Sequence, residues 1–277
     1  MNEPLEVVIT TPIYRGGAYV LDLFLANQKA VQRYYPSSEL MFATAEGDLA
    51  PELEALIASW GLRGRVLLYE TVKPAYARSR GWNVACGREA LRRYVLEHTD
   101  AGYMLCLDAD MTYDPHVVDI MMRELQGHDY VHSGYALRDY GLGLSGTGCT
   151  LFTRGLLERM RFRCVEFRNG DALPEDVMVE LDLFRLRARV KKGFFVSISH
   201  YVSPDDVRHI DPRPVGVLRA IANSPLVRYI LILASITLER NIPWRLKRAV
   251  HTCRHPVKGS AGAGRAPMMR GQKQGDA

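Results

Sequence analysis

Short apolar segments alternate with longer amphipathic ones through the first part of this 277-residue chain. The apolar segments, each followed by turn or polar residues, are 5–11, 40–43, 65–69 and 103–107. The amphipathic segments have helical spacing and cover about 18–35, 51–60 and 75–98. Strands that alternate with helices over short links predict an α/β fold, with a mainly parallel sheet covered by helices on both faces. In such a sheet, ligands bind beyond the carboxyl ends of the strands.

The second part of the chain continues this pattern and then changes. We expect the following elements: helices at 115–126 and 174–189, and strands at 130–137, 149–152 and 194–200. From Pro214 onward the pattern is helical without strands, which predicts a helical C-terminal appendage.

Asp108-Ala109-Asp110 directly follows the apolar segment 103–107. Side chains two residues apart in an extended chain point to the same side. Two carboxylates where a strand leaves the core repel each other unless a cation lies between them. Their hard oxygen atoms suit Mg²⁺ or Mn²⁺. The alternative is a solvated turn, because Asp is common where strands end.

Two further groups are candidates for the same site. Pro174 as the first residue of a helix would place Glu175 and Asp176 in its first turn, where the positive helix end stabilises carboxylates. Helix capping alone would also explain this pattern. His200 closes an apolar strand and is either a structural residue or, together with the two aspartates, part of a Mn²⁺ site.

Charge is unevenly distributed along the chain. The formal net charge is +5, but residues 240–277 carry nine Lys or Arg against one acid, so this segment contributes +8 and residues 1–239 contribute −3. A basic tail favours an anionic surface, either membrane or nucleic acid. For 254–277 we favour a disordered solubilising tail. Since a nucleic-acid role would rest on this tail alone, we expect no nucleic-acid partner.

The segment 225–238 is strongly apolar but is interrupted by Arg228. It is too short and too charged to span a bilayer. Because Trp244 and several Lys and Arg residues follow it, 225–250 resembles an interfacial helix on an anionic membrane surface. A helix packed on the main domain or at a dimer interface is the equal alternative.

Five scattered cysteines show no paired metal spacing and fit a reducing compartment. Residues 1–4 lack the basic start of a signal peptide, and no apolar run reaches the roughly eighteen residues of a spanning helix. We therefore expect a cytoplasmic protein, either free or at the inner face of a membrane.

The order of these pieces resembles nucleotide-sugar glycosyltransferases of the GT-A fold, especially family 2. The matching pieces are Val7–Pro12, Ala77–Gly81, Leu107–Met111 with Pro115, Gly146–Gly148 with Leu151–Arg154, Pro174–Asp176 and His200. The resemblance covers about 5–205 and is carried by the order and spacing of the motifs. It implies a GT-A catalytic domain over 1–212, with a nucleotide-sugar half at about 1–112 and an acceptor half at about 113–212. The appendage would be 213–253.

The resemblance also assigns roles to individual residues. Asp110 would bind a Mn²⁺ or Mg²⁺ ion that bridges the donor phosphates, with His200 as a further ligand. Asp108 would hold the ribose and support the metal. Asp176 matches the general base that deprotonates the acceptor hydroxyl. The remaining expected donor-binding residues are Thr11, Pro12, Tyr14, Glu46, Arg78, Gly146, Thr147, Gly148 and Glu175.

Two positions depart from the family pattern. The Asp that often reads the uracil base after the second strand is absent, and Glu46 could substitute for it within Thr44–Asp48. The Asn that usually follows the Arg is Ser79 here. The base could therefore be that of a UDP- or a GDP-sugar.

The resemblance thus predicts a metal-dependent hexosyltransferase-like enzyme that moves a sugar from a UDP- or GDP-sugar to a glycan or lipid-linked acceptor, with inversion. One alternative is a polyprenyl-phosphate glycosyltransferase of the dolichyl-phosphate mannose synthase type, which 107–111 and Pro115 also resemble. Another is a non-catalytic nucleotide- or glycan-binding protein on the same fold. A nucleotidyltransferase ranks third, because the loop after the first strand holds only Arg15-Gly16-Gly17.

Overall fold

The computed structural model describes residues 5–137, 141–167 and 172–241. The chain divides into two compact units, Met1–Ser235 and Ile236–Ala277. The elements below belong to the first unit, apart from the end of the last helix, α8 (Pro225–Asn241), which enters the second.

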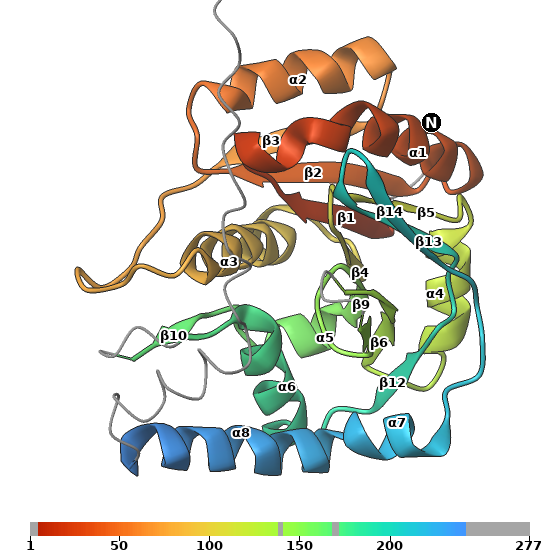
Figure 1. Ribbon diagram of the computed structural model, residues 1–277. Helices are drawn as coiled ribbons and strands as arrows, with labels where there is room; N and C mark the ends of the chain where they lie inside the picture. Colours follow the sequence, from red (N-terminus) through yellow and green to blue (C-terminus); the bar gives the residue numbers. More distant parts are fainter. Residues whose placement is uncertain (1–4, 138–140, 168–171, 242–277) are drawn as a thin grey trace, which may run out of the picture. The chain divides into compact units, whose positions relative to one another are not determined.

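A seven-stranded sheet with the order β12-β6-β9-β4-β1-β2-β3 forms the centre of the first unit (Figure 1). Its strands are β1 (Val7–Pro12), β2 (Ser38–Thr44), β3 (Gly64–Leu68), β4 (Tyr103–Leu107), β6 (Tyr130–Ser133), β9 (Cys149–Thr153) and β12 (Val190–Gly193). β1 pairs in parallel with β2 and β4, β2 with β3, and β12 with β6. β9 is antiparallel to both β4 and β6. The predicted mainly parallel sheet is confirmed.

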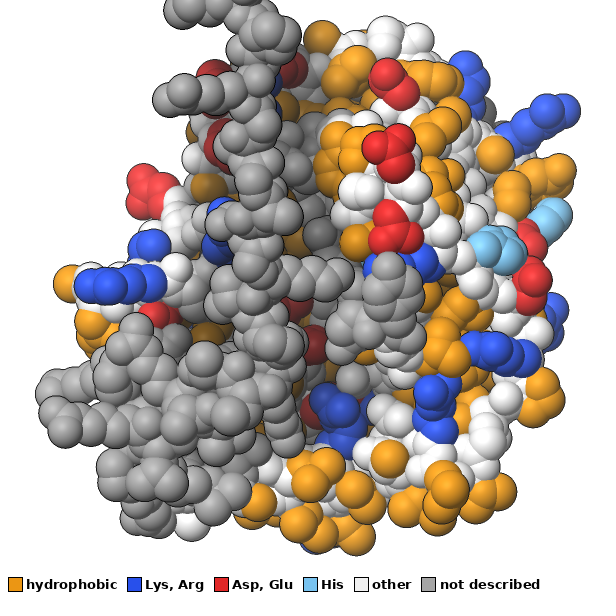
Figure 2. Space-filling model, viewed as in Figure 1, with side chains coloured by type: hydrophobic (Ala, Val, Ile, Leu, Met, Phe, Trp, Pro, Cys, Tyr) orange, Lys and Arg blue, Asp and Glu red, His pale blue; other side chains and the backbone are white. Residues whose placement is uncertain are grey.

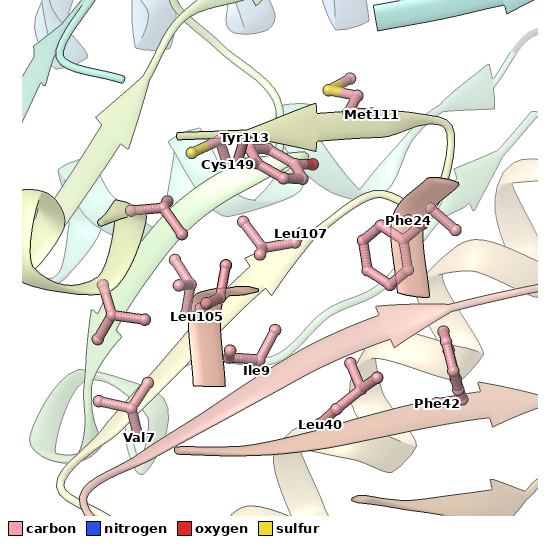
Figure 3. Close-up of a cluster of buried hydrophobic side chains, with 14 of the residues drawn as sticks. Val7, Ile9, Phe24, Leu40, Phe42, Leu105, Leu107, Met111, Tyr113 and Cys149 are labelled. Carbon is pink, nitrogen blue, oxygen red and sulfur yellow. The ribbon is translucent and has the colours of Figure 1, made fainter. Parts of the chain in front are cut away.

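Helices cover both faces of this sheet, as predicted. The helices before α8 are η1 (Arg15–Val20), α1 (Leu21–Tyr34), α2 (Leu49–Trp60), α3 (Gly81–His98), α4 (Val117–Leu125), α5 (Arg154–Leu157), α6 (Glu175–Arg185) and α7 (Val217–Ala222). Successive strand residues alternate between two cores, because side chains on a strand point to opposite faces. Val7 and Ile9 pack with Phe24 of α1 in one cluster (Figure 3), whereas Val8 packs with Leu91 of α3 in the other.

A smaller three-stranded sheet consists of β5 (Met111–Tyr113), β13 (Ile198–Ser203) and β14 (Asp206–Ile210). Two hairpins complete the fold: β7 (Tyr135–Ala136) with β8 (Leu142–Gly143), and β10 (Val165–Glu166) with β11 (Ala172–Leu173). The sequence pattern did not predict β5 or β14, because both are short and lack a continuous apolar run.

Several predicted boundaries were wrong, and tertiary contacts explain two of them. The helix expected from 75 begins at Gly81, because Glu166 accepts hydrogen bonds from the backbone N–H groups of Arg78 and Ser79. The strand expected at 130–137 breaks at Gly134, where a Cβ atom would lie 2.4 Å from the Gly143 carbonyl oxygen. The breaks therefore occur where another part of the chain comes close.

The strand expected at 194–200 was misplaced. β12 ends at Gly193 and β13 begins at Ile198, so His200 lies inside a strand rather than at its end. Its neighbours across the small sheet are Met111 and Arg208. This pairing brings His200 to the chain that directly follows β4.

The first part of α8 packs on the main domain. Tyr229 stacks on Phe184 of α6, with ring centroids 4.2 Å apart and an interplanar angle of 20°. Ile232 on the same helix is buried. Within the described ranges, no helix combines the length and the apolar character that crossing a membrane requires.

Candidate active site

A cavity of about 560 Å³ opens at the carboxyl ends of β1, β2 and β4. This is the position at which open α/β sheets bind ligands. Most of the residues expected from the sequence line it: Pro12, Tyr14, Glu46, Asp108, Asp110, Gly146, Thr147, Glu175, Asp176 and His200. The structure therefore gathers into one space residues that are spread over nearly 190 positions of the chain.

Three expected residues lie outside this lining. Thr11 is buried and donates from its hydroxyl to the Leu107 carbonyl oxygen at 2.8 Å, so it ties the end of β1 to β4. Gly148 accepts a hydrogen bond from the Asp108 backbone, and a Cβ atom there would lie 2.5 Å from Asp108 Oδ2. Arg78 is exposed and is held through its backbone by Glu166. In this structure Thr11 and Gly148 support the site from behind.

Asp110 and His200 face each other across the turn that follows β4. His200 Nδ1 lies 2.6 Å from the Ala136 carbonyl oxygen. Because a carbonyl oxygen only accepts, Nδ1 carries a proton and the other ring nitrogen faces Asp110. That nitrogen, Nε2, lies 3.4 Å from Asp110 Oδ2. A ring nitrogen beside a carboxylate oxygen either carries a proton and forms an ion pair, or shares a cation with the carboxylate.

Asp110 and His200 also fit a divalent cation. Mn²⁺ accepts both imidazole and carboxylate ligands, and Mg²⁺ usually keeps positions for water and phosphate oxygens. Across the described ranges, no three His, Cys, Asp or Glu side chains are grouped closely enough to hold a metal ion by themselves. The donor set that the structure offers is therefore a pair, with room for ligands from a substrate.

Asp108 instead contacts a cation of the chain itself, Arg88 on α3. Arg88 Nη2 lies 2.5 Å from Asp108 Oδ1, and Arg88 Nε lies 3.5 Å from Glu175 Oε1. Thr147 donates from its hydroxyl to Glu175 Oε1 at 3.0 Å. The Arg88 side chain is only 2% exposed. One buried guanidinium thus connects the end of β4 to the start of α6.

Burial and charge act in opposite directions on these groups. Burial raises the pKa of Asp108, Arg88 opposes this effect, and Asp110 adds to it, so the pKa lies above its ordinary value. Burial likewise raises the pKa of Glu175 against the opposing effect of Arg88. Burial would lower the pKa of Arg88, but the nearby carboxylates more than offset this and the pKa is raised. Arg88 is therefore a permanent positive charge beneath the cavity.

Arg88 was not predicted from the sequence, whereas Arg78 was. A signal was present: Arg88 falls in the helical stripe formed by the buried residues Ala85, Leu91 and Val95. A charged residue in an apolar stripe is rarely buried without a partner. The partners, however, come from residues 20 and 87 positions away, and only the fold brings them there.

Glu46 and Asp176 complete the polar lining. The backbone N–H of Arg15 donates to Glu46 Oε2 at 3.0 Å, so the loop after β1 fixes this carboxylate. Asp176 lies in the first turn of α6, as predicted, with Pro174 at the N-cap rather than inside the helix. Among the described lining residues there are five carboxylates and one guanidinium. A diphosphate would be repelled by this surface unless a cation came with it.

No protein-family model matches the chain, and no curated protein matches it either. The inositol-1-phosphate CTP transferase of T. maritima is similar over 74% of this chain and 92% of its own, at 8% identity and a TM-score of 0.49. The mannosyltransferase PcManGT of Pyrobaculum calidifontis, solved with GDP-Man and Mn²⁺, is similar over 92% and 82%, at 13% identity and a TM-score of 0.46. S. aureus TarS 1-349 with UDP-GlcNAc is similar over 93% and 76%, at 14% identity and a TM-score of 0.44.

At these identities and TM-scores we draw no conclusion about activity from the three likenesses. Membership of family 2 stays a prediction. The structure itself establishes a mixed α/β fold with a mainly parallel central sheet and a carboxylate-rich cavity at its carboxyl edge.

Proposed function

We propose that this chain is a metal-dependent glycosyltransferase, with residues 1–212 as its catalytic part. It transfers a sugar from a UDP- or GDP-sugar to a hydroxyl of a glycan or lipid-linked acceptor, with inversion. The observation that carries the proposal is the Asp110–His200 pair, which shares one cavity with Asp176 on a different element. The pair offers a cation site for a diphosphate, and Asp176 offers a base.

In this proposal Asp110 and His200 hold Mn²⁺ or Mg²⁺. When bound, the metal neutralises the charge that develops on the leaving nucleoside diphosphate. Asp108 binds a hydroxyl of the donor ribose in this proposal and also supports the metal site. Since its Oδ1 contacts Arg88, its Oδ2 is the oxygen that we assign to a ribose hydroxyl.

Asp176 is the proposed general base. An acceptor hydroxyl is a poor nucleophile until its proton is removed during the attack. The first turn of α6 places the half-buried Asp176 carboxylate in the lining of the cavity, where it can face an acceptor hydroxyl. One base opposite one leaving group corresponds to a single displacement with inversion.

The other lining residues bind the donor. Pro12 and Tyr14 would contact the nucleoside, with the half-exposed Tyr14 ring available for stacking. Glu46 would read the base. Arg78 lies outside the cavity lining, whereas Arg88 contacts two of its carboxylates. We therefore assign Arg88, in place of Arg78, the role of holding Asp108 and Glu175 in position.

Thermal unfolding with Mn²⁺ and UDP, GDP or no nucleotide tests the donor site. A nucleotide at about a hundred times its Kd should raise the free energy of unfolding by about 2.7 kcal/mol. We expect one nucleotide to stabilise the protein only with metal, and Asp110→Ala to lose this effect. Asp205→Ala, an exposed acid in the turn between β13 and β14, is the matched control and should keep it.

Turnover of the stabilising UDP- or GDP-sugar tests the chemistry. Asp110→Ala and Asp176→Ala should each lower sugar transfer by more than about a hundredfold. If Asp176→Ala still binds the nucleotide with metal but no longer transfers the sugar, Asp176 acts in the chemical step and not in the metal site. Nucleotide binding without any turnover in the wild type would favour the non-catalytic alternative, and full activity of Asp110→Ala would exclude the proposed metal site.

A further inference from the structure

The outer sides of α7 and the first part of α8 carry apolar side chains. Val217 and Leu218 on α7 are 76% and 85% exposed. Leu226, Ile230 and Leu231 on α8 are each more than half exposed. Figure 2 shows hydrophobic side chains gathered along the lower edge of the molecule, where Figure 1 places α7 and the start of α8. We call these five residues the α7–α8 apolar face.

This face cannot be buried by a simple rotation of α8. Leu226 and Ile230 are four residues apart and therefore share one side of the helix. A neighbouring side of the helix is held against the domain by the stacking of Tyr229 on Phe184 and by the burial of Ile232. A helix that is apolar on both sides normally has both sides covered, and contiguous exposed apolar patches mark interaction sites.

The charge of the adjoining chain indicates what covers this face. Arg213 and Arg219 lie against the Phe194 ring, with guanidinium carbons 5.0 and 5.8 Å from its centroid. Residues 240–277, which continue directly from α8, carry a net charge of +8, against −3 for the rest of the chain. A second copy of this chain carries the same positive charge, whereas an anionic surface carries the opposite one, so the charge favours the anionic surface.

We propose that the α7–α8 apolar face docks on an anionic membrane surface. Its apolar side chains enter the headgroup–acyl boundary, and the net positive charge of the sequence after α8 attracts the protein to anionic headgroups. Apolar burial and headgroup attraction together bind such surfaces, and neither alone gives stable anchoring. This inference is independent of the proposed glycosyltransferase activity, because it involves none of the residues that line the cavity.

Co-sedimentation of the full chain with vesicles tests the proposal. The probes are phosphatidylcholine vesicles with and without 30% phosphatidylglycerol, at about 0.15 M salt. We expect binding to the anionic vesicles and at least about tenfold weaker binding to the neutral ones. The double variant Leu226→Glu/Ile230→Glu should bind the anionic vesicles at least about tenfold more weakly than the wild type.

The matched control is Leu23→Glu/Val207→Glu, which changes two similarly exposed apolar residues elsewhere and adds the same charge. It should bind as the wild type does, and circular dichroism should show that both variants are folded. If both double variants lost vesicle binding equally, the loss would come from the added negative charge, and the proposed role of the apolar face would be overturned. Unchanged binding of Leu226→Glu/Ile230→Glu, or no vesicle binding at all, would also overturn it. If the wild type self-associates in analytical ultracentrifugation and Leu226→Glu/Ile230→Glu does not, the face binds a second copy of the chain instead.

Discussion

Two arginines in this protein each bridge two carboxylates, one beneath the cavity and one at its rim. Arg88 lies between Asp108 and Glu175 and is almost fully buried. Arg15 lies between Asp48 and Glu52, at 3.0 and 2.8 Å, with half of its side chain exposed. The distances are similar, so geometry alone does not separate the two clusters. Burial does, because a charge without a partner is costly in the interior and nearly harmless in water.

The difference shows where the charges of this protein have structural consequences. At the rim, water can replace any lost partner of Arg15. Beneath the cavity, removal of Arg88 would leave two carboxylates whose pKa values burial already raises. Arg88 therefore sets the positions of Asp108 and Glu175, and through α6 it connects the end of β4 to Asp176.

The largest effect is expected from Arg88→Met. This change keeps much of the side-chain volume but leaves Asp108 and Glu175 without their cation, and the loss should be about 3–5 kcal/mol of unfolding free energy. Chemical denaturation at pH 7 measures it. Both acids have raised pKa values in the folded protein, and the variant also lacks the opposing charge of Arg88. The folded variant should therefore bind protons more readily than the unfolded chain, and its stability should recover as the pH falls. A loss that is independent of pH would indicate a packing defect instead.

Arg88→Lys separates charge from geometry. Lys keeps the positive charge but cannot reach two carboxylates with a planar fork. We expect the variant to be more stable than Arg88→Met and yet to lose sugar transfer through kcat rather than KM, because Asp108 and Glu175 are no longer aligned. Wild-type kcat in the Lys variant would mean that Arg88 contributes only charge.

His132 extends the comparison to a buried base that has no carboxylate beside it. Burial, followed by Lys192 and Arg228, lowers the pKa of His132 to about 3. The unfolded chain, with an ordinary value of 6.5, therefore binds an extra proton between pH 6.5 and 3. This contribution to stability is complete above pH 6.5 and is lost as the pH falls below it, by about 1.4 kcal/mol per pH unit.

Denaturation of the wild type and His132→Gln between pH 7 and 5 measures this slope. The unfolding free energy of the variant should fall less steeply as the pH falls, because the proton taken up by His132 on unfolding is missing. This holds even if the variant is less stable at pH 7. Parallel curves for the two proteins would show that His132 does not titrate with unfolding.

The smallest effect is expected from Arg15→Met. Its partners Asp48 and Glu52 are exposed and become solvated when the guanidinium is removed. The denaturation midpoint should match that of the wild type within experimental error, which makes this variant the control for Arg88→Met. A clear loss of stability would mean that the rim cluster is more than a solvated contact.

The segment Asp108-Ala109-Asp110 shows how much could be predicted from local sequence. Asp108 and Asp110 both line the cavity, as predicted. Side chains two residues apart point to the same side only in an extended chain, but β4 ends at Leu107, and Ala109 and Asp110 form a turn. As a result the two carboxylates meet different partners, Arg88 and His200. The acids were predictable because they directly follow a strand, but their partners belong to distant elements.

The sequence by itself determined the alternating strands and helices of the first part of the chain, the mainly parallel sheet with helices on both faces, and the edge at which the cavity opens. These follow from side-chain periodicity and chain connectivity, which act over a few residues or a single crossover. Only the tertiary structure decided that Arg88 is the cation of the site, that Glu166 holds the chain before α3 open, and that β13 delivers His200 to Asp110. Each of these depends on burial and on contacts between residues 20 to 90 positions apart, and no local pattern encodes which distant carboxylate a buried charge will meet.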